Sequence, residues 1–155
     1  MYKFTGFTEK ANRALNSAVE TAENLGHTYV GSEHLLCGIV KEAGTIATSQ
    51  LSSKGITAQS VEQEIRKTVG VGIPTVLTPD DFTPRSKHII ELSVSVAAKE
   101  NAGYVGTEHL LNAILSEDDS CANYILSQLG HSSHSLLSEI NSASGKSSYS
   151  SATSR

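Results

Sequence analysis

The sequence contains two copies of one pattern, and the second copy follows the first at a constant offset of 75 positions. Residues 29–36 read YVGSEHLL and residues 104–111 read YVGTEHLL, so seven of the eight positions are identical. The dipeptide FT occurs at residues 7–8 and again at residues 82–83, with the same offset. Self-similarity at a fixed spacing indicates a duplicated structural unit. Any fold of this chain must therefore accommodate two similar halves.

Each copy begins with the pattern of an amphipathic helix. In residues 11–25, alanine, leucine and valine recur three and four positions apart, which places them on one helix face. Thr8 precedes this stretch as a candidate N-cap, and Gly26 follows it as a stop signal. In the second copy Thr83 is followed by proline, the favoured order at a helix start.

Three further helices are predicted in each copy, and no segment shows the alternation that is typical of a strand. The second helices begin at Ser32 and Thr107, the third cover 44–54 and 119–129, and the fourth cover 57–69 and 132–142. In the first copy, Ile46, Ala47 and Leu51 are expected to face inward. The sequence thus predicts an all-α fold of about eight helices in two pseudo-symmetric four-helix halves.

The predicted domain covers residues 1–142. Within it, the first repeat covers residues 4–69 and the second covers residues 82–142. Residues 70–81 (GVGIPTVLTPDD), rich in glycine, proline and threonine, are predicted to form a connecting loop. Residues 143–155 are rich in serine and are predicted to be a flexible linker or tail.

Composition excludes several classes of protein. The formal net charge is -4 and the pI about 5.8, which argues against a nucleic-acid backbone as the main partner. Two cysteines are too few for a disulfide framework or a paired-cysteine metal site. No apolar run is long enough to span a membrane, and the first residues lack the apolar core of a signal peptide. We therefore expect a cytoplasmic protein.

The strongest candidates for chemistry are the retained glutamates Glu33 and Glu108, each at the start of a predicted helix. One interpretation is structural, because a carboxylate in the first turn is favoured by the helix dipole. The other adds Thr8 and Thr83 at the neighbouring helix starts, where free N–H groups attract anions. Threonine, free N–H groups and a carboxylate together would suit a ligand that is anionic at one end and cationic at the other.

An enzyme is the less favoured interpretation. A small acid/base or metal enzyme would need Glu33 and His34, or Glu108 and His109, to converge in one cleft. Neighbouring residues on a helix point about 100° apart, and the spacing is not that of HExxH. Neither a GxSxG turn nor a cysteine-nucleophile motif occurs. No catalytic residue, metal site or cofactor is predicted.

The repeated FTx[KR] and Y-V-G-[ST]-E-H-L-L blocks resemble the Clp N-terminal domain of the AAA+ unfoldases, and are closest to the ClpC group. The resemblance covers about residues 4–142. It implies a bundle of two four-helix repeats that receives protein substrates and adaptor proteins for a hexameric unfoldase and its peptidase. No ATPase module is present in these 155 residues, so we expect a monomeric binding domain and no enzyme.

In the ClpC branch, this domain is a receptor for phosphoarginine on proteins marked for degradation. The resemblance assigns phosphoarginine binding to Thr8 with Glu33, and to Thr83 with Glu108. All four residue types are present.

The resemblance also implies an adaptor or inhibitor surface at Phe82, Lys87 and Glu91. Two alternatives remain open. One is a protein-docking platform without phosphoarginine binding, as in ClpA- or ClpB-like relatives or a stand-alone homologue. The other is an assembly domain for the unfoldase, which would self-associate.

Overall fold

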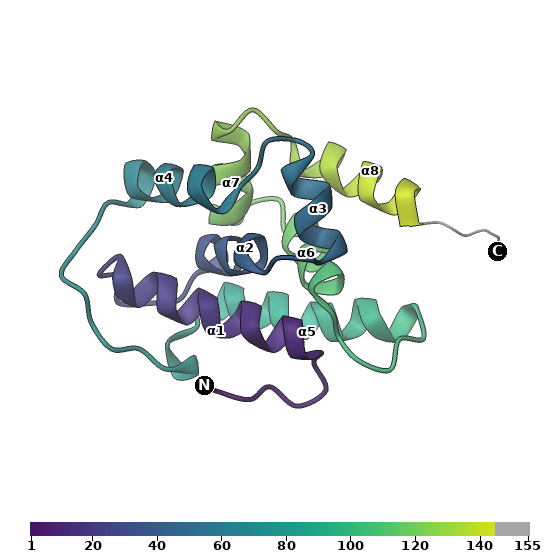
Figure 1. Ribbon diagram of the computed structural model, residues 1–155, viewed down its shortest axis with the longest axis horizontal. Coiled ribbons are helices and arrows are strands. Elements are labelled where there is room, and N and C mark those ends of the chain that lie inside the picture. The colour runs from purple at the N-terminus through teal and green to yellow at the C-terminus, as the bar shows by residue number, and fades with distance from the viewer. Residues whose placement is uncertain (145–155) are drawn as a thin grey trace.

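The computed structural model describes residues 1–144 of the chain, and within them it contains helices and no strand (Figure 1). The eight α-helices are α1 (Glu9–Asn24), α2 (Ser32–Lys41), α3 (Ile46–Ser52), α4 (Ala58–Val69), α5 (Pro84–Lys99), α6 (Thr107–Ser116), α7 (Cys121–Gln128) and α8 (Ser133–Ser144). A short 3-10 turn, η1 (Pro79–Asp81), precedes α5. The predicted all-α class is confirmed. From residue 145 onward, the predicted serine-rich tail lies outside the described residues.

The duplication is visible in the helix boundaries. The first residues of α5, α6, α7 and α8 each lie 75 positions after the first residues of α1, α2, α3 and α4. Both long helices begin at the predicted threonines. The Thr8 hydroxyl accepts a hydrogen bond from the Ala11 N–H at 3.0 Å, and the Thr83 hydroxyl accepts one from the Ser86 N–H at 3.0 Å. The same local capping signal therefore begins both repeats.

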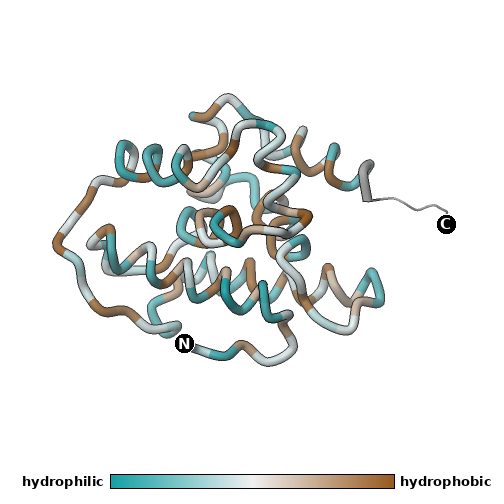
Figure 2. Tube along the Cα trace, viewed as in Figure 1, coloured by the Kyte–Doolittle hydropathy of each residue, from teal (hydrophilic) through white to brown (hydrophobic). Residues whose placement is uncertain are grey.

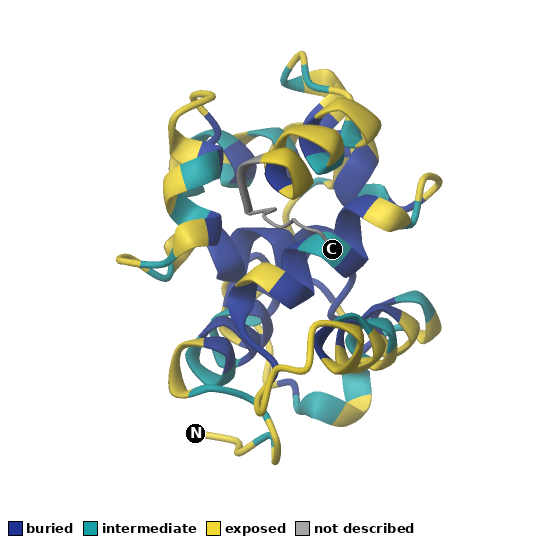
Figure 3. Ribbon diagram, turned by 90° about the vertical axis from the view of Figure 1, so that its right-hand side faces the viewer, coloured by how far each residue is buried: buried dark blue, intermediate teal, exposed yellow. Residues whose placement is uncertain are grey.

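Helices α2 and α6 form the centre of the molecule. Each contacts the long helix of its own repeat, and the two contact each other (Figures 1 and 3). Every residue of α2 except Lys41 is buried. Its leucines and isoleucine belong to the core, and burying one such side chain contributes about 1.5–3 kcal/mol relative to leaving it exposed. The retained Leu-Leu pair of the repeated motif thus forms the core on both sides.

One close helix contact distinguishes the first repeat. Gly38 of α2 faces α1 so closely that an added Cβ would collide with the Ala14 carbonyl oxygen and lie 2.9 Å from the Ala18 nitrogen. The equivalent residue of α6 is Ala113, which is also fully buried. The α1–α2 pair is therefore packed around a glycine, whereas the α5–α6 pair accommodates a methyl group.

The predicted connecting loop is held against the C-terminal end of α1. The Gly72 N–H donates to the Leu25 carbonyl at 2.8 Å, and the Leu77 N–H donates to Glu23 Oε2 at 2.8 Å. Three apolar residues of this segment are nevertheless exposed: Val71, Ile73 and Val76. The loop as a whole includes brown, hydrophobic stretches in Figure 2.

The two repeats are joined by reciprocal backbone contacts. The Thr8 N–H donates to the Val105 carbonyl at 2.9 Å, and the Thr83 N–H donates to the Val30 carbonyl at 3.0 Å. These bonds accompany two isolated parallel bridges, Phe7 with Val105 and Val30 with Phe82. The start of each long helix is thereby fixed beside the start of the central helix of the other repeat.

One inward-facing assignment is wrong. Ala47 and Leu51 are fully buried, but Ile46 is 65% exposed. Ile46 is the first residue of α3 and lines an open cavity between the repeats, so its helical position does not place it against the core. Within residues 1–144, no helix is long and apolar enough to cross a membrane.

Candidate ligand-binding sites

The retained motif builds the same helix start in both repeats. Gly31 and Gly106 are the N-caps of α2 and α6, and an added Cβ at Gly106 would collide with the Glu108 carboxylate. The side chain of the third helical residue returns to the cap. His34 Nδ1 accepts from the Gly31 N–H at 2.8 Å, and His109 Nδ1 accepts from the Gly106 N–H at 2.9 Å. The glycine, glutamate and histidine of the motif are thus parts of one local geometry.

Both ring nitrogens of His34 are occupied. His34 Nε2 lies 2.7 Å from His27 Nδ1, and His27 Nε2 lies 2.8 Å from the Gly70 carbonyl oxygen. Because the Gly31 N–H donates to His34 and the Gly70 carbonyl accepts from His27, all these bonds are satisfied with both rings neutral. Burial and the neighbouring His27 lower the pKa of His34 to about 3.

His109 is occupied in a different way. Its Nε2 lies 3.0 Å from Glu100 Oε1, while its Nδ1 holds the cap of α6. Each motif histidine therefore serves the helix start and a second protein group. Neither has a ring nitrogen directed at its neighbouring motif glutamate. Among the described residues, no group of three or more metal-binding side chains is placed to hold a metal ion.

The structure pairs the predicted site residues across the repeats. Thr8 lines one cavity together with Thr107 and Glu108, and the backbone of Thr83 is bonded to the segment that leads into Ser32. Pairing of Thr8 with Glu33, and of Thr83 with Glu108, was expected within each repeat. In the structure, the reciprocal bridges place each long helix beside the other repeat's central helix, and Thr8 lies with Glu108 around one cavity.

We call the residues Thr8, Lys10, Thr107 and Glu108 the first site. They surround a cavity of about 360 Å³ that Thr45 and Ile46 also line. Lys10 Nζ donates to the Gly44 carbonyl at 3.1 Å, which leaves ammonium hydrogens for a ligand. Glu108 is exposed, and no side chain or backbone group within residues 1–142 bonds its carboxylate.

The polar groups of the first site include a positive charge, a negative charge and a hydroxyl group. The Thr8 hydroxyl accepts from the cap of α1, and its own hydrogen has no acceptor among the described residues. Glu9 also lines the cavity, and its carboxylate pairs with Arg13 at 3.5 Å. A cationic Lys10, a free hydroxyl and an open Glu108 carboxylate can together bind a ligand that has an anionic and a cationic end.

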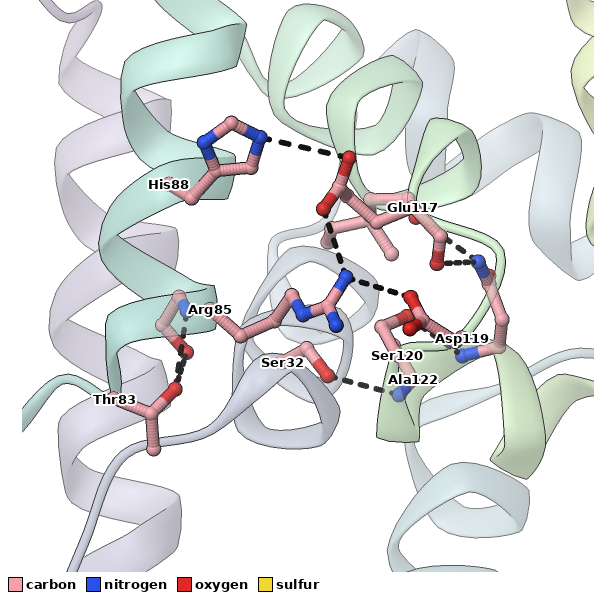
Figure 4. A network of polar contacts seen from close by, with 11 residues as sticks. Ser32, Thr83, Arg85, His88, Glu117, Asp119, Ser120 and Ala122 are labelled. Carbon is pink, nitrogen blue, oxygen red and sulfur yellow. Dashed lines mark hydrogen bonds and ion pairs between the residues drawn. The ribbon is translucent and has the colours of Figure 1, made fainter.

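We call the equivalent residues Thr83, Arg85, Ser32 and Glu33 the second site, and Figure 4 shows three of them. The Thr83 hydroxyl donates to Ser86 Oγ at 2.9 Å, and the Ser86 hydroxyl donates to the Val30 carbonyl at 2.9 Å. Ser32 Oγ accepts from the Ala122 N–H at 2.9 Å. The hydroxyl groups of this site are bonded within the protein.

Arg85 is paired with two carboxylates. Its Nη1 lies 2.9 Å from Glu117 Oε1 and 2.7 Å from Asp119 Oδ1, and the guanidinium points between them in Figure 4. His88 approaches the other oxygen of Glu117 at 3.6 Å. Hydrogen bonding to Arg85 lowers the pKa of Asp119. The cation of the second site is thus already neutralised by the protein.

Glu33 is covered. Only 2% of the residue is exposed, and the Tyr29 hydroxyl donates to its Oε2 at 3.0 Å. Burial, followed by the Glu33 charge, raises the pKa of Tyr29. The same two causes raise the pKa of Cys121 to about 12. Tyr29 and Cys121 therefore enclose a carboxylate whose counterpart Glu108 faces solvent.

The sequence contained a signal for two further site residues. Lys10 and Arg85 follow the capping threonines by two positions in both repeats, so a cation is retained at this place in the duplication. Tyr29 and Tyr104 are also retained, yet only Tyr29 bonds to the neighbouring glutamate, and Tyr104 is 65% exposed. A sequence difference that accompanies their different roles lies two positions upstream, where His27 of the first repeat corresponds to Ala102 of the second.

The predicted adaptor surface is only partly accessible. Lys87 and Glu91 are exposed on α5, one helical turn apart. Phe82 is 5% exposed and packs edge-on against Phe4, with ring centroids 6.2 Å apart. Phe82 therefore contributes to the junction of the repeats more than to an outer surface.

Comparison with known proteins identifies the family. The pattern of the Clp repeat (R) N-terminal domain matches this chain over residues 6–129 and 81–154. The chain belongs to the Clp N-terminal domain family. The chaperone protein ClpC1 from Oryza sativa subsp. japonica is 36% identical over 137 residues, which are 88% of this chain and 15% of that protein. The chaperone protein ClpB from Oceanobacillus iheyensis is 36% identical over the same share of this chain and 17% of its own length.

Solved structures agree on the fold of this Clp N-terminal domain. The N-terminal domain of ClpD from Arabidopsis thaliana superposes with a TM-score of 0.77 at 24% identity, covering 92% of this chain and all of that one. The Hsp104 N-terminal domain from Candida albicans gives a TM-score of 0.70 at 14% identity, covering 90% and 91%. The predicted fold of two four-helix repeats is therefore confirmed.

Proposed function

We propose that this Clp N-terminal domain docks substrates and adaptor proteins for a Clp AAA+ unfoldase and recognises phosphoarginine on proteins marked for degradation. The first site carries the proposal. It combines a free Thr8 hydroxyl, the Lys10 ammonium and the open Glu108 carboxylate around one cavity. Phosphoarginine has the matching chemistry, since its phosphoryl group is anionic and its guanidino group donates hydrogen bonds in a planar fork.

The charges around the cavity determine the orientation of the bound phosphoarginine. The phosphoryl group would lie against Lys10 and the starts of α1 and α6, where free N–H groups and the helix dipoles favour an anion. The guanidino group would lie against Glu108, as a planar donor fork does with a carboxylate. Thr83 and Glu33 provide the same residue types at the second site, but Glu33 is buried there.

Calorimetric titration with free phosphoarginine tests this function. Saturable binding is expected, with arginine and phosphoserine each binding at least about tenfold more weakly because each lacks one of the two charged groups. Glu108→Gln keeps the size of the side chain and should weaken binding at least about tenfold. Glu20→Gln, an exposed residue of α1, is the matched control and should bind as the parent does. Equal binding of arginine and phosphoarginine would contradict the proposal.

One observation favours a docking platform without phosphoarginine recognition. A mostly apolar cavity of about 610 Å³ lies beside the N-terminal segment and is lined by Phe4, Phe7 and Tyr104, among other residues. An apolar surface of this kind suits side chains of a peptide partner. Under this alternative, a folded domain would show no saturable phosphoarginine binding. It would still bind an adaptor, and Lys87→Glu or Glu91→Lys would weaken that complex.

A further inference from the structure

The two sites share their backbone geometry and differ in whether their polar groups are already bonded. At the first site, the Thr8 hydroxyl hydrogen and the Glu108 carboxylate have no partner among the described residues. At the second site, the Thr83 hydroxyl donates to Ser86, and Tyr29 donates to Glu33. The residue equivalent to Ser86 in the first repeat is Ala11, which has no side-chain oxygen to accept such a bond.

The different positions of the two tyrosines have a local cause. Tyr29 stacks on His27 with ring centroids 5.8 Å apart and an interplanar angle of 7°, and this holds its hydroxyl over Glu33. The residue equivalent to His27 in the second repeat is Ala102, which offers no ring. Tyr104 consequently lies 65% exposed and leaves Glu108 uncovered.

The cations of the two sites also differ in whether the protein already pairs them. Lys10 contacts only a backbone carbonyl, at Gly44, so its positive charge remains available to a phosphoryl group. Arg85 is bonded to Glu117 and Asp119, and Asp119 occupies the position equivalent to Gly44 (Figure 4). A phosphoryl dianion at the second site would lie beside the carboxylates of Glu117 and Asp119 on Arg85, which is electrostatically unfavourable.

We propose that the first site alone binds phosphoarginine, and that Tyr29, Ser86 and Asp119 keep the second site closed. This inference rests on the proposed phosphoarginine function. It assigns one ligand to each domain, although the sequence retains the threonine and glutamate of both sites. The duplication has thus produced one open pocket and one in which the protein's own side chains satisfy the recognition groups.

The test is the stoichiometry of calorimetric titration with phosphoarginine on the full chain. We expect one equivalent per chain for the parent protein. Glu108→Gln should weaken that binding at least about tenfold, whereas Glu33→Gln, which still accepts a bond from Tyr29, should change affinity less than about twofold. Circular dichroism confirms that each variant is folded.

A gain of binding tests the closing residues. The combined variant Tyr29→Ala, Ser86→Ala and Asp119→Ala removes the bond to Glu33, the acceptor of the Thr83 hydroxyl and one of the two carboxylates on Arg85. It should raise the stoichiometry from one to two. Tyr104→Ala is the matched control in the other repeat and should leave it at one. A combined variant that folds and still binds one equivalent would overturn the role of these three residues.

The remaining outcomes separate this inference from the function on which it rests. Two equivalents in the parent protein, one lost with Glu108→Gln and the other with Glu33→Gln, would overturn the inference and leave phosphoarginine recognition intact. Loss of the single site with Glu33→Gln alone would also overturn it. No saturable binding by a folded parent protein would overturn both.

Discussion

The two repeats have nearly superimposable sequence patterns, yet the first repeat's Glu33 is enclosed and the second repeat's Glu108 is open. Both glutamates are the second residue of their helix, both follow a glycine cap, and both precede a histidine that returns to that cap. The difference comes from the position of the motif tyrosine: His27, which lies outside the motif, stacks on Tyr29 and holds its hydroxyl over Glu33. A retained motif therefore preserves a backbone geometry, and the surrounding side chains decide whether it can bind a ligand.

The largest effect is expected where the helix pairs of the two repeats differ. Gly38→Ala would place a methyl group against the Ala14 carbonyl and should destabilise the domain by about 2 kcal/mol through overpacking. The measurement is urea denaturation, which gives the free energy of unfolding.

The matched change in the second repeat is Ala113→Gly. It should lower the free energy of unfolding by about 1 kcal/mol, mostly because glycine loses more backbone entropy on folding. No collision is involved, since the α5–α6 pair already accommodates the methyl group. A Gly38→Ala variant as stable as the parent would show that α1 and α2 can separate freely, and would remove this distinction between the repeats.

The next largest effect is the pH dependence of the free energy of unfolding, which should differ between the two motif histidines. In the unfolded chain His34 takes up a proton as the pH falls below its ordinary pKa of 6.5, whereas the folded pKa is lowered to about 3. The contribution of His34 to the free energy of unfolding is therefore fully present above pH 6.5. It is lost as the pH falls toward 3, by up to about 1.4 kcal/mol per pH unit. Urea denaturation at pH 7 and pH 5 measures the slope.

Replacing each histidine in turn locates the cause of that slope. His34→Asn should reduce the pH dependence, since it removes the ring that faces His27. His109→Asn should leave the contribution of His34 in place, because His109 Nε2 faces the Glu100 carboxylate and not a second imidazole. An unchanged slope in His34→Asn would refute the assignment.

A smaller effect reports directly on the enclosed carboxylate. Burial and the Glu33 charge raise the pKa of Cys121 to about 12, so its thiol should react with iodoacetamide at pH 8 at least about tenfold more slowly than an exposed cysteine. Glu33→Gln removes the negative charge and should accelerate alkylation. Cys37, buried with its pKa raised to about 11, provides an internal reference whose rate should not change. Mass spectrometry distinguishes the two sites.

The smallest effect is expected at the ion pair that neutralises the second site. Asp119 is exposed, so Asp119→Asn should change the melting temperature little, and less at high salt than at low salt. The first site has no equivalent pair, because glycine occupies position 44. A large loss of stability would show that the Arg85 pair has a structural role beyond closing the site.

Much of the fold could be predicted from residue spacing. The helix starts at Thr8 and Thr83, the all-α class and the four-helix repeat are consequences of local patterns, because capping and amphipathic periodicity depend on residues a few positions apart. The exposure of Ile46 could not be predicted in this way. Its place in the helical pattern is apolar, but it lines an open cavity that residues of both repeats form.

The sequence by itself determined that this protein is a duplicated helical domain of the Clp family, and that threonine and glutamate stand at equivalent helix starts. Only the tertiary structure decided that Thr8 meets Glu108, and that Tyr29 covers Glu33 while Tyr104 leaves its counterpart open. The reason is physical. Helix formation depends on neighbours along the chain, whereas pairing and burial depend on contacts between segments that are distant in sequence, such as Thr8 with Val105.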